Sequence, residues 1–140
     1  MPNRIYLDHA ATTPVRPEVR EAILPYLGDA FGNPSSGHTF GRAARAGLET
    51  ARRQVAEALG VSSREILFTS GGTEADNQAI LGCLIAKHSG DLAKAHIVSS
   101  PTEHKAVLGA LHEAERLGAR VTLLPVDKDG LVDVGALAEI

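Results

Sequence analysis

The order of the predicted elements indicates an α/β fold with a mainly parallel sheet. After residue 60, three short β-prone runs alternate with three helical patterns, in the order β, α, β, α, β, α. Such an alternation favours parallel strands joined by right-handed helical crossovers. A glycine pair, Gly71 and Gly72, separates the first of these strands from its helix, and His104 follows the second strand. Because ligands of parallel sheets bind at the carboxyl ends of the strands, these residues mark a candidate site.

The composition is that of an ordinary globular protein of single-domain length. Of the 140 residues, 44% are hydrophobic and 22% are charged, which allows a packed core. The net charge of -3 provides no basic surface for nucleic acid. The longest apolar run, at 79–86, is too short to span a bilayer. From the charge and the short apolar run we expect no nucleic acid and no membrane partner. The single cysteine, Cys83, rules out an internal disulfide and a CxxC metal site. We therefore expect no metal and a cytoplasmic location, where cysteines stay reduced.

The N-terminal 60 residues are predicted to hold an extended segment and two helices. Residues 1–14 are expected to be extended, because their small polar residues cannot build a core element. Pro17 opens the first helix at a position where its missing N–H costs nothing, and Gly28 ends that helix. Residues 42–59 form the second helix, which stops at Gly60.

A turn-rich loop at residues 31–41 precedes the second helix. Its polar side chains are dense enough to line a site: Asn33, Ser35, Ser36 and His38. The same composition is also typical of an ordinary surface loop. We therefore assign none of these residues to a binding site.

Residues 66–77 form the predicted centre of the chain. Ile66 to Phe68 is a short β-prone run, and a helical pattern begins at Thr73 and continues to about His88. A glycine turn at a helix start leaves unpaired N–H groups at the positive end of the helix dipole, where a phosphate binds. The turn matches neither GxxxxGK[ST] nor GxGxxG, so a nucleoside triphosphate or a dinucleotide is not the first ligand to expect. An ordinary strand–helix connection without a ligand can also contain glycines and a threonine.

The remainder of the chain completes the alternation. Residues 95–99 form the second strand, and Ser100, Pro101 and Glu103 predict a capping box that starts a helix. His104 is then expected on the first turn of that helix. A third strand at 120–126, a turn at 127–130 and the start of a helix at 134–140 follow.

Apolar residues at helical spacing predict which helix faces are buried. The predicted core residues are Leu48, Ala51, Val55 and Leu59 on the helix at 42–59; Ile80, Leu81, Leu84 and Ile85 on the helix from Thr73; and Val107, Leu108, Leu111 and Ala114 on the helix after Glu103. Cys83 lies among apolar neighbours and is expected to be a buried, unreactive thiol.

Four motifs, in order and spacing, resemble the NifS/IscS-type cysteine desulfurases of the class V aminotransferase group. They are YLDHAATTP at 6–14, GNPSSGH at 32–38, FTSGGTEADN at 68–77 and TEHKAV at 102–107. These enzymes are fold-type I, pyridoxal 5′-phosphate (PLP)-dependent transferases. The resemblance implies that residues 15–140 are the N-terminal part of the PLP-binding large domain, which is incomplete in this chain.

The resemblance also implies the roles of individual residues. Gly72 and Thr73 would hold the PLP phosphate, and His104 would lie against the pyridine ring and move protons. The family converts L-cysteine to L-alanine and an enzyme-bound persulfide, which supplies sulfur for iron–sulfur clusters or tRNA thiolation. The expected partners are L-cysteine, a sulfur-acceptor or scaffold protein, and a second copy in a homodimer of the full-length protein.

Three groups that the family reaction needs lie downstream of the matched segment: the lysine that binds PLP, the aspartate beside the pyridine nitrogen and the cysteine that takes the sulfur. Neither Lys105 nor Cys83 matches them, so we expect the 140 residues alone to be inactive. Two alternatives are a non-catalytic module that dimerises with or regulates a full-length relative, and a small α/β phosphate-binding protein unrelated to PLP enzymes.

The position of the strand at 66–69 separates two topologies. Short crossovers alone predict that it neighbours the strand at 95–99, because consecutive strands are adjacent more often than not. The family topology instead places later strands between the two. It therefore predicts a gap beside 66–69, pairing of 95–99 with 120–126, and an isolated chain of marginal stability.

Overall fold

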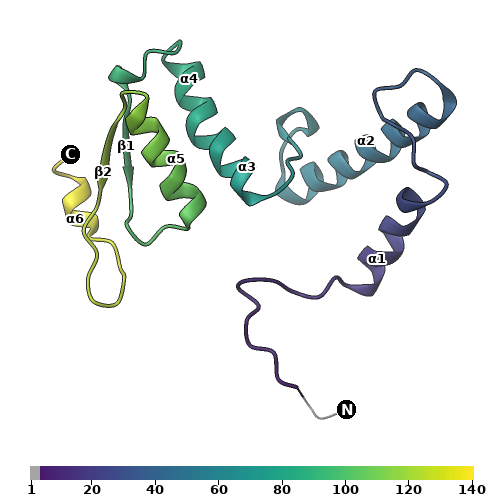
Figure 1. The fold of residues 1–140 in the computed structure, drawn as a ribbon, viewed down its shortest axis with the longest axis horizontal. Helices are drawn as coiled ribbons and strands as arrows, with labels where there is room; N and C mark the ends of the chain where they lie inside the picture. Colours follow the sequence, from purple (N-terminus) through teal and green to yellow (C-terminus); the bar gives the residue numbers. More distant parts are fainter. Residues whose placement is uncertain (1–3) are drawn as a thin grey trace. The chain divides into compact units, whose positions relative to one another are not determined.

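The computed structural model describes residues 4–140; Met1–Asn3, which begin the segment expected at 1–14, lie outside the described residues. The chain divides into two compact units, Met1–Leu67 (unit 1) and Phe68–Ile140 (unit 2), each of which is described separately. Figure 1 shows that the described part of unit 1 contains only helices and loops, whereas both strands belong to unit 2.

From Arg4 onward, unit 1 contains two α-helices and two 3-10 turns: α1 (Pro17–Ile23), η1 (Leu24–Leu27), α2 (Thr39–Leu59) and η2 (Ser63–Glu65). Pro17 begins α1 at its first position, as predicted. The C-cap Gly60 has φ 69°, the left-handed conformation that stops a helix. α2 starts three residues before the predicted residue 42, because the His38 ring Nδ1 accepts a hydrogen bond from the Gly41 N–H and caps the helix.

Backbone segments approach closely around the start of α2. A Cβ at Gly41 would lie 2.2 Å from the Ser36 carbonyl oxygen, and one at Gly32 would lie 2.2 Å from the Phe40 carbonyl oxygen. At Gly47 a Cβ would lie 2.3 Å from the Tyr26 hydroxyl oxygen. These glycines let the loop at 31–41 and the η1 turn pack directly on α2.

The predicted apolar stripe of α2 is only partly correct. Leu48 and Ala51 are half-buried, but Leu59 is 66% exposed. The buried positions are instead small residues, Ala44 and Ala56 among them. Small side chains allow the close backbone contacts of this unit. The prediction was wrong for Leu59 because it assumed that the larger apolar residues would be the buried ones.

Unit 2 is a helix-and-sheet unit with the elements α3 (Gly72–Asn77), η3 (Gln78–Gly82, a π turn), α4 (Cys83–Lys87), η4 (Leu92–Lys94), β1 (His96–Ser99), α5 (Lys105–Arg116), β2 (Arg120–Leu123) and α6 (Val134–Leu137). β1 and β2 are parallel, with His96 opposite Arg120 and Ser99 opposite Leu123. α5 is the crossover between them and also packs against α3 (Figure 1).

Ile66 has extended backbone angles, but residues 66–69 take no place in the sheet, which consists of β1 and β2 within the described residues. The simple prediction that 66–69 and 95–99 are neighbours is therefore wrong. The predicted pairing of the two later strands is confirmed, and 66–69 forms no ladder with 95–99. Backbone sterics favour an extended run at Ile66–Phe68, but hydrogen-bond partners decide whether that run becomes a strand.

The core of unit 2 is small. Its buried cluster comprises Leu92, Ala95, Ala114 and Ala119, against which Leu81, Leu84 and Ile97 pack. The predicted inward face of α5 is confirmed at Leu111 and Ala114, which are buried, but Ile85 of α4 is 47% exposed. A core built largely from alanines removes little apolar area from water and contributes correspondingly little stability.

Cys83 is exposed, so the prediction that it is buried is wrong. Half-buried positions of this helical stretch include a row at every fourth residue, Asp76, Ile80, Leu84 and His88, and its neighbours Asn77 and Leu81. Cys83 precedes Leu84 by one residue and so lies about 100° around the helix from that row. Apolar neighbours in the sequence are therefore a poor guide to its burial.

The predicted capping box at the start of α5 is also wrong. Ser100, Pro101 and Thr102 form a turn in which the Thr102 N–H donates to the Ser100 hydroxyl oxygen at 3.2 Å, and α5 begins only at Lys105. β2 ends at Leu123 instead of 126, because Pro125 has no N–H for the ladder. No helix within residues 4–140 is long and apolar enough to cross a membrane.

Candidate functional site

The starts of α3 and α5 lie at one end of unit 2. Figure 1 shows both helices beginning at the end of the sheet where β1 finishes, and α3 packs against α5. The sequence predicted that the glycine turn and His104 lie at one edge, from the rule that parallel strands end together, but that rule applies only to His104, since 66–69 is not a strand of the sheet. The two candidate elements therefore belong to one face of one compact unit.

The turn before α3 offers free backbone donors. Its N-cap is Gly71, which provides no side-chain cap, and the first backbone bond of the helix is from the Ala75 N–H to the Gly71 carbonyl oxygen at 3.1 Å. Among the described residues, no hydrogen bond uses the N–H groups of Gly72, Thr73 or Glu74. Three adjacent donors at a helix start form a suitable cradle for an anion.

Packing does not require glycine at this turn. A Cβ at Gly71 or Gly72 would meet no other atom within 4 Å, and neither residue has the left-handed φ that favours glycine. The space in front of the free N–H groups is thus open to a ligand. Thr73 is exposed beside it, and its hydroxyl makes no hydrogen bond within residues 4–140. Donors, space and hydroxyl together fit a phosphate group.

Glu74 fastens the same turn. Its Oε2 accepts hydrogen bonds from the Ser70 hydroxyl at 2.6 Å and from the Ser70 N–H at 2.7 Å. The bond from the hydroxyl, followed by that from the N–H, lowers the pKa of the Glu74 carboxyl below 4.5, against a small opposing effect of desolvation. A depressed folded-state pKa means that these bonds stabilise the turn above pH 4.5 and are lost as the pH falls through the lower value.

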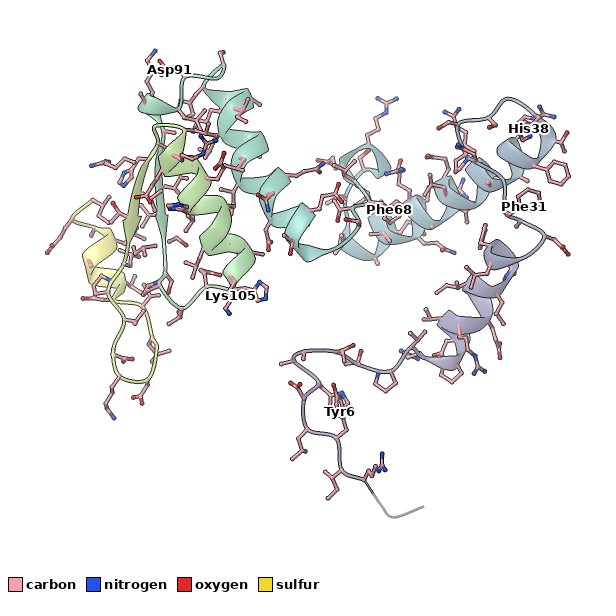
Figure 2. The ribbon with its side chains drawn as sticks, in the orientation of Figure 1. Tyr6, Phe31, His38, Phe68, Asp91 and Lys105 are labelled. Atoms are coloured by element: carbon pink, nitrogen blue, oxygen red, sulfur yellow. The ribbon has the colours of Figure 1, made fainter. Side chains whose placement is uncertain are left out.

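His104 caps α5 instead of lying on its first turn. Its ring Nδ1 accepts a hydrogen bond from the Ala106 N–H at 3.2 Å, and the side chain is exposed. Because Nδ1 accepts, this hydrogen bond assigns the proton of the neutral ring to Nε2. Lys105, the next residue, marks this end of α5 in Figure 2. No hydrogen bond among the described residues uses the Nε2 N–H, which is left for a ligand.

The loop at 31–41 belongs to unit 1, and two of its four polar side chains, Asn33 and His38, accept hydrogen bonds from nearby backbone. The Asn33 side-chain oxygen accepts from the Ser35 N–H at 2.9 Å, and His38 caps α2. These bonds give Asn33 a role in the turn and His38 a role as a helix cap.

The Ser70–Glu74 pair and the capping role of His104 were not predicted. Both are sequence-local, but a capping box has its acid three residues after the serine, whereas Glu74 follows Ser70 by four. Histidine is also absent from the usual N-cap residues. Within the described residues, no group of three or more His, Cys, Asp or Glu side chains could hold a metal ion.

Comparison with known proteins places this geometry in context. The profile of the family described as aminotransferase class-V matches residues 5–140. The cysteine desulfurase IscS of Dictyoglomus turgidum is 51% identical over 133 residues, which are 95% of this chain and 33% of that protein. The chain spans about a third of the length of the curated relatives it matches.

Solved structures share the fold. A NifS-like protein superposes with a TM-score of 0.87 at 38% identity, over 98% of this chain and 37% of that one. A structure of SspA in complex with cysteine superposes with a TM-score of 0.84 at 36% identity, over 96% of this chain and 38% of that one. The predicted α/β fold, as part of the larger fold of NifS-like enzymes, is confirmed.

Proposed function

Because this chain belongs to the aminotransferase class-V family, with cysteine desulfurases of the IscS and NifS type among its homologues, we propose that it contributes the phosphate-binding turn of a PLP-dependent cysteine desulfurase. The observation that carries the proposal is the glycine turn at 71–72, where the N–H groups are free and the space beside both Cα atoms is open. The reaction converts L-cysteine to L-alanine and leaves the sulfur on an enzyme cysteine as a persulfide. The protein would then supply sulfur for iron–sulfur clusters or tRNA thiolation.

The cofactor would be held at the start of α3. The N–H groups of Gly72 and Thr73, together with the Thr73 hydroxyl, are the donors that would bind the PLP phosphate. Bound PLP supplies the electron sink that this chemistry needs. In this proposal residues 15–140 belong to the PLP-binding domain, of which unit 2 carries the cradle.

His104 would act through its Nε2 atom. The Ala106 N–H holds Nδ1 and so sets both the ring orientation and the position of the proton on Nε2. A ring held in this way would present one defined N–H donor, at Nε2, toward the bound cofactor and substrate. His104 would therefore combine a capping role at Nδ1 with a catalytic role at Nε2.

The proposed substrate and partners extend from the same relatives. One structural neighbour is described as a complex with cysteine, which supports L-cysteine as the substrate here. A cytoplasmic homodimer that passes sulfur to an acceptor or scaffold protein completes the proposal.

A hybrid enzyme tests the function. These 140 residues would replace the matching region of the Dictyoglomus turgidum relative, so that the other two thirds of that protein supply the remaining groups. We expect the hybrid to release alanine from L-cysteine in the presence of PLP and a reductant. A hybrid that folds and binds PLP but forms no alanine would contradict the proposal.

A polypeptide limited to the 140 residues is expected to release neither sulfide nor alanine above a no-protein control. The reason is that neither Lys105 nor Cys83 corresponds to the lysine or the cysteine that the family reaction uses. The measurement is the same alanine assay, with the hybrid as the positive control. Turnover by the short polypeptide would show that its own residues suffice.

A further inference from the structure

We propose that Glu74 is a positioning residue for the phosphate site: by binding Ser70, its carboxylate holds the turn and keeps itself away from the N–H groups that the ligand needs. This inference rests on the proposed function, because it concerns the phosphate of PLP at the same turn. It assigns a role to two residues, Ser70 and Glu74, that make no proposed contact with the cofactor.

The Glu74 carboxylate binds a residue that lies beyond the N-cap of its helix. In an ordinary helix start, a Ser, Thr, Asp or Asn side chain at the N-cap takes one of the free N–H groups. In a capping box, the acid at N3 binds the N–H of the N-cap. Here the N-cap is Gly71, and the N3 acid, Glu74, reaches past it to the Ser70 N–H and hydroxyl. All the donors of the first turn stay free.

The charge of Glu74 is of the same sign as that of a phosphate ligand. A carboxylate in the first turn of a helix is attracted by the N–H groups and dipole of that turn, as a phosphate is. Glu74 is the acidic residue of the first turn of α3, so an unrestrained Glu74 would compete with an anionic ligand for the same donors. Two hydrogen bonds from Ser70 to one carboxylate oxygen satisfy that charge elsewhere.

Two substitutions distinguish this positioning role from simple structural support of the turn. Glu74→Gln removes the negative charge. It therefore weakens the two hydrogen bonds from Ser70, and it also removes the carboxylate that could compete with the phosphate for the N–H groups. Ser70→Ala keeps the charge but removes the hydroxyl donor, and so frees a carboxylate to compete. Competition therefore predicts that Ser70→Ala harms phosphate binding more than Glu74→Gln. A purely structural role predicts the reverse order, because Glu74→Gln weakens two bonds and Ser70→Ala removes one.

The hybrid enzyme described above is the protein for the test, and the dissociation constant of PLP is the first measurement. We expect Ser70→Ala to weaken PLP binding about tenfold, and Glu74→Gln by less than that. Glu65→Gln is the matched control, since Glu65 also accepts a bond from a serine N–H, that of Ser62 at 2.8 Å, but does so in unit 1. It should leave PLP affinity unchanged.

The second measurement needs no cofactor. In hybrid protein labelled with 15N-serine, the Ser70 amide signal, identified by its loss in Ser70→Ala, should shift with a midpoint below pH 4.5. That titration should disappear in Glu74→Gln. A Ser70 amide that does not titrate, or that titrates equally in Glu74→Gln, would overturn the inference.

The two proposals fail in different ways. If the unmodified hybrid does not bind PLP, the proposed function is wrong. If it binds PLP while Ser70→Ala binds as well as the unmodified protein, or better than Glu74→Gln, only the role of Glu74 is wrong.

Discussion

Replacing His104 by asparagine is expected to lower cysteine turnover by the hybrid enzyme by about 100- to 10,000-fold, the range for loss of a general acid–base group. The structure makes asparagine the informative choice. Its side-chain oxygen can accept the Ala106 N–H bond that the ring Nδ1 accepts now, so α5 keeps its cap. The variant keeps the cap but lacks the imidazole ring and with it the second nitrogen, Nε2. Steady-state alanine formation, with PLP content measured in parallel, is the assay.

His104→Ala provides the matched comparison. It should lose the same turnover, but it should also lose about 1 kcal/mol of stability because α5 loses its cap. Most of the bound PLP should remain in both variants, since the phosphate donors of Gly72 and Thr73 are unchanged. If His104→Asn retains full turnover, His104 is a capping residue only.

Gly41→Ala is expected to destabilise the hybrid enzyme by about 3 kcal/mol, at the upper end of the usual cost of overpacking. The added Cβ would lie 2.2 Å from the Ser36 carbonyl oxygen and 2.7 Å from the Asn33 carbonyl oxygen. Both atoms are backbone, so relief requires the loop at 31–41 to separate from α2. The urea midpoint and the rate of proteolysis within this loop measure the effect.

Gly37→Ala is the control in the same loop. A Cβ at Gly37 would meet nothing within 4 Å, so its stability should change by no more than about 0.5 kcal/mol. Equal stability of the two variants would show that the approach of the loop to α2 is not as close as the structure describes. The sequence alone gave no reason to separate Gly37 from Gly41.

Local chemistry explains which elements could be predicted. Pro17 begins α1 and Gly60 ends α2, because a missing N–H and a left-handed φ act within one turn of chain. The parallel pair β1 and β2 follows from the length of the crossover that contains α5. The motif residues Gly72, Thr73 and His104 were selected from the sequence, and their roles remain predictions.

Hydrogen-bond competition explains two local errors. Ser100 was expected to cap α5, but its hydroxyl instead serves the turn that leads to Thr102. His104 then becomes the cap, a role that the sequence pattern does not indicate. Several nearby side chains could have supplied the acceptor, and only the path of the backbone after β1 decides which one does.

The sequence by itself determined the β–α–β alternation from residue 95 onward, the start of α1, the end of α2 and the glycine turn, because each depends on backbone conformations that a few neighbouring residues set. Tertiary structure alone decided that residues 66–69 form no strand, that Cys83 faces outward and that Glu74 binds Ser70. Those outcomes depend on which partners occupy the surrounding space. A hydrogen-bond donor requires an acceptor, and an apolar face requires a packing partner. The packing of distant segments decides which residues take these positions.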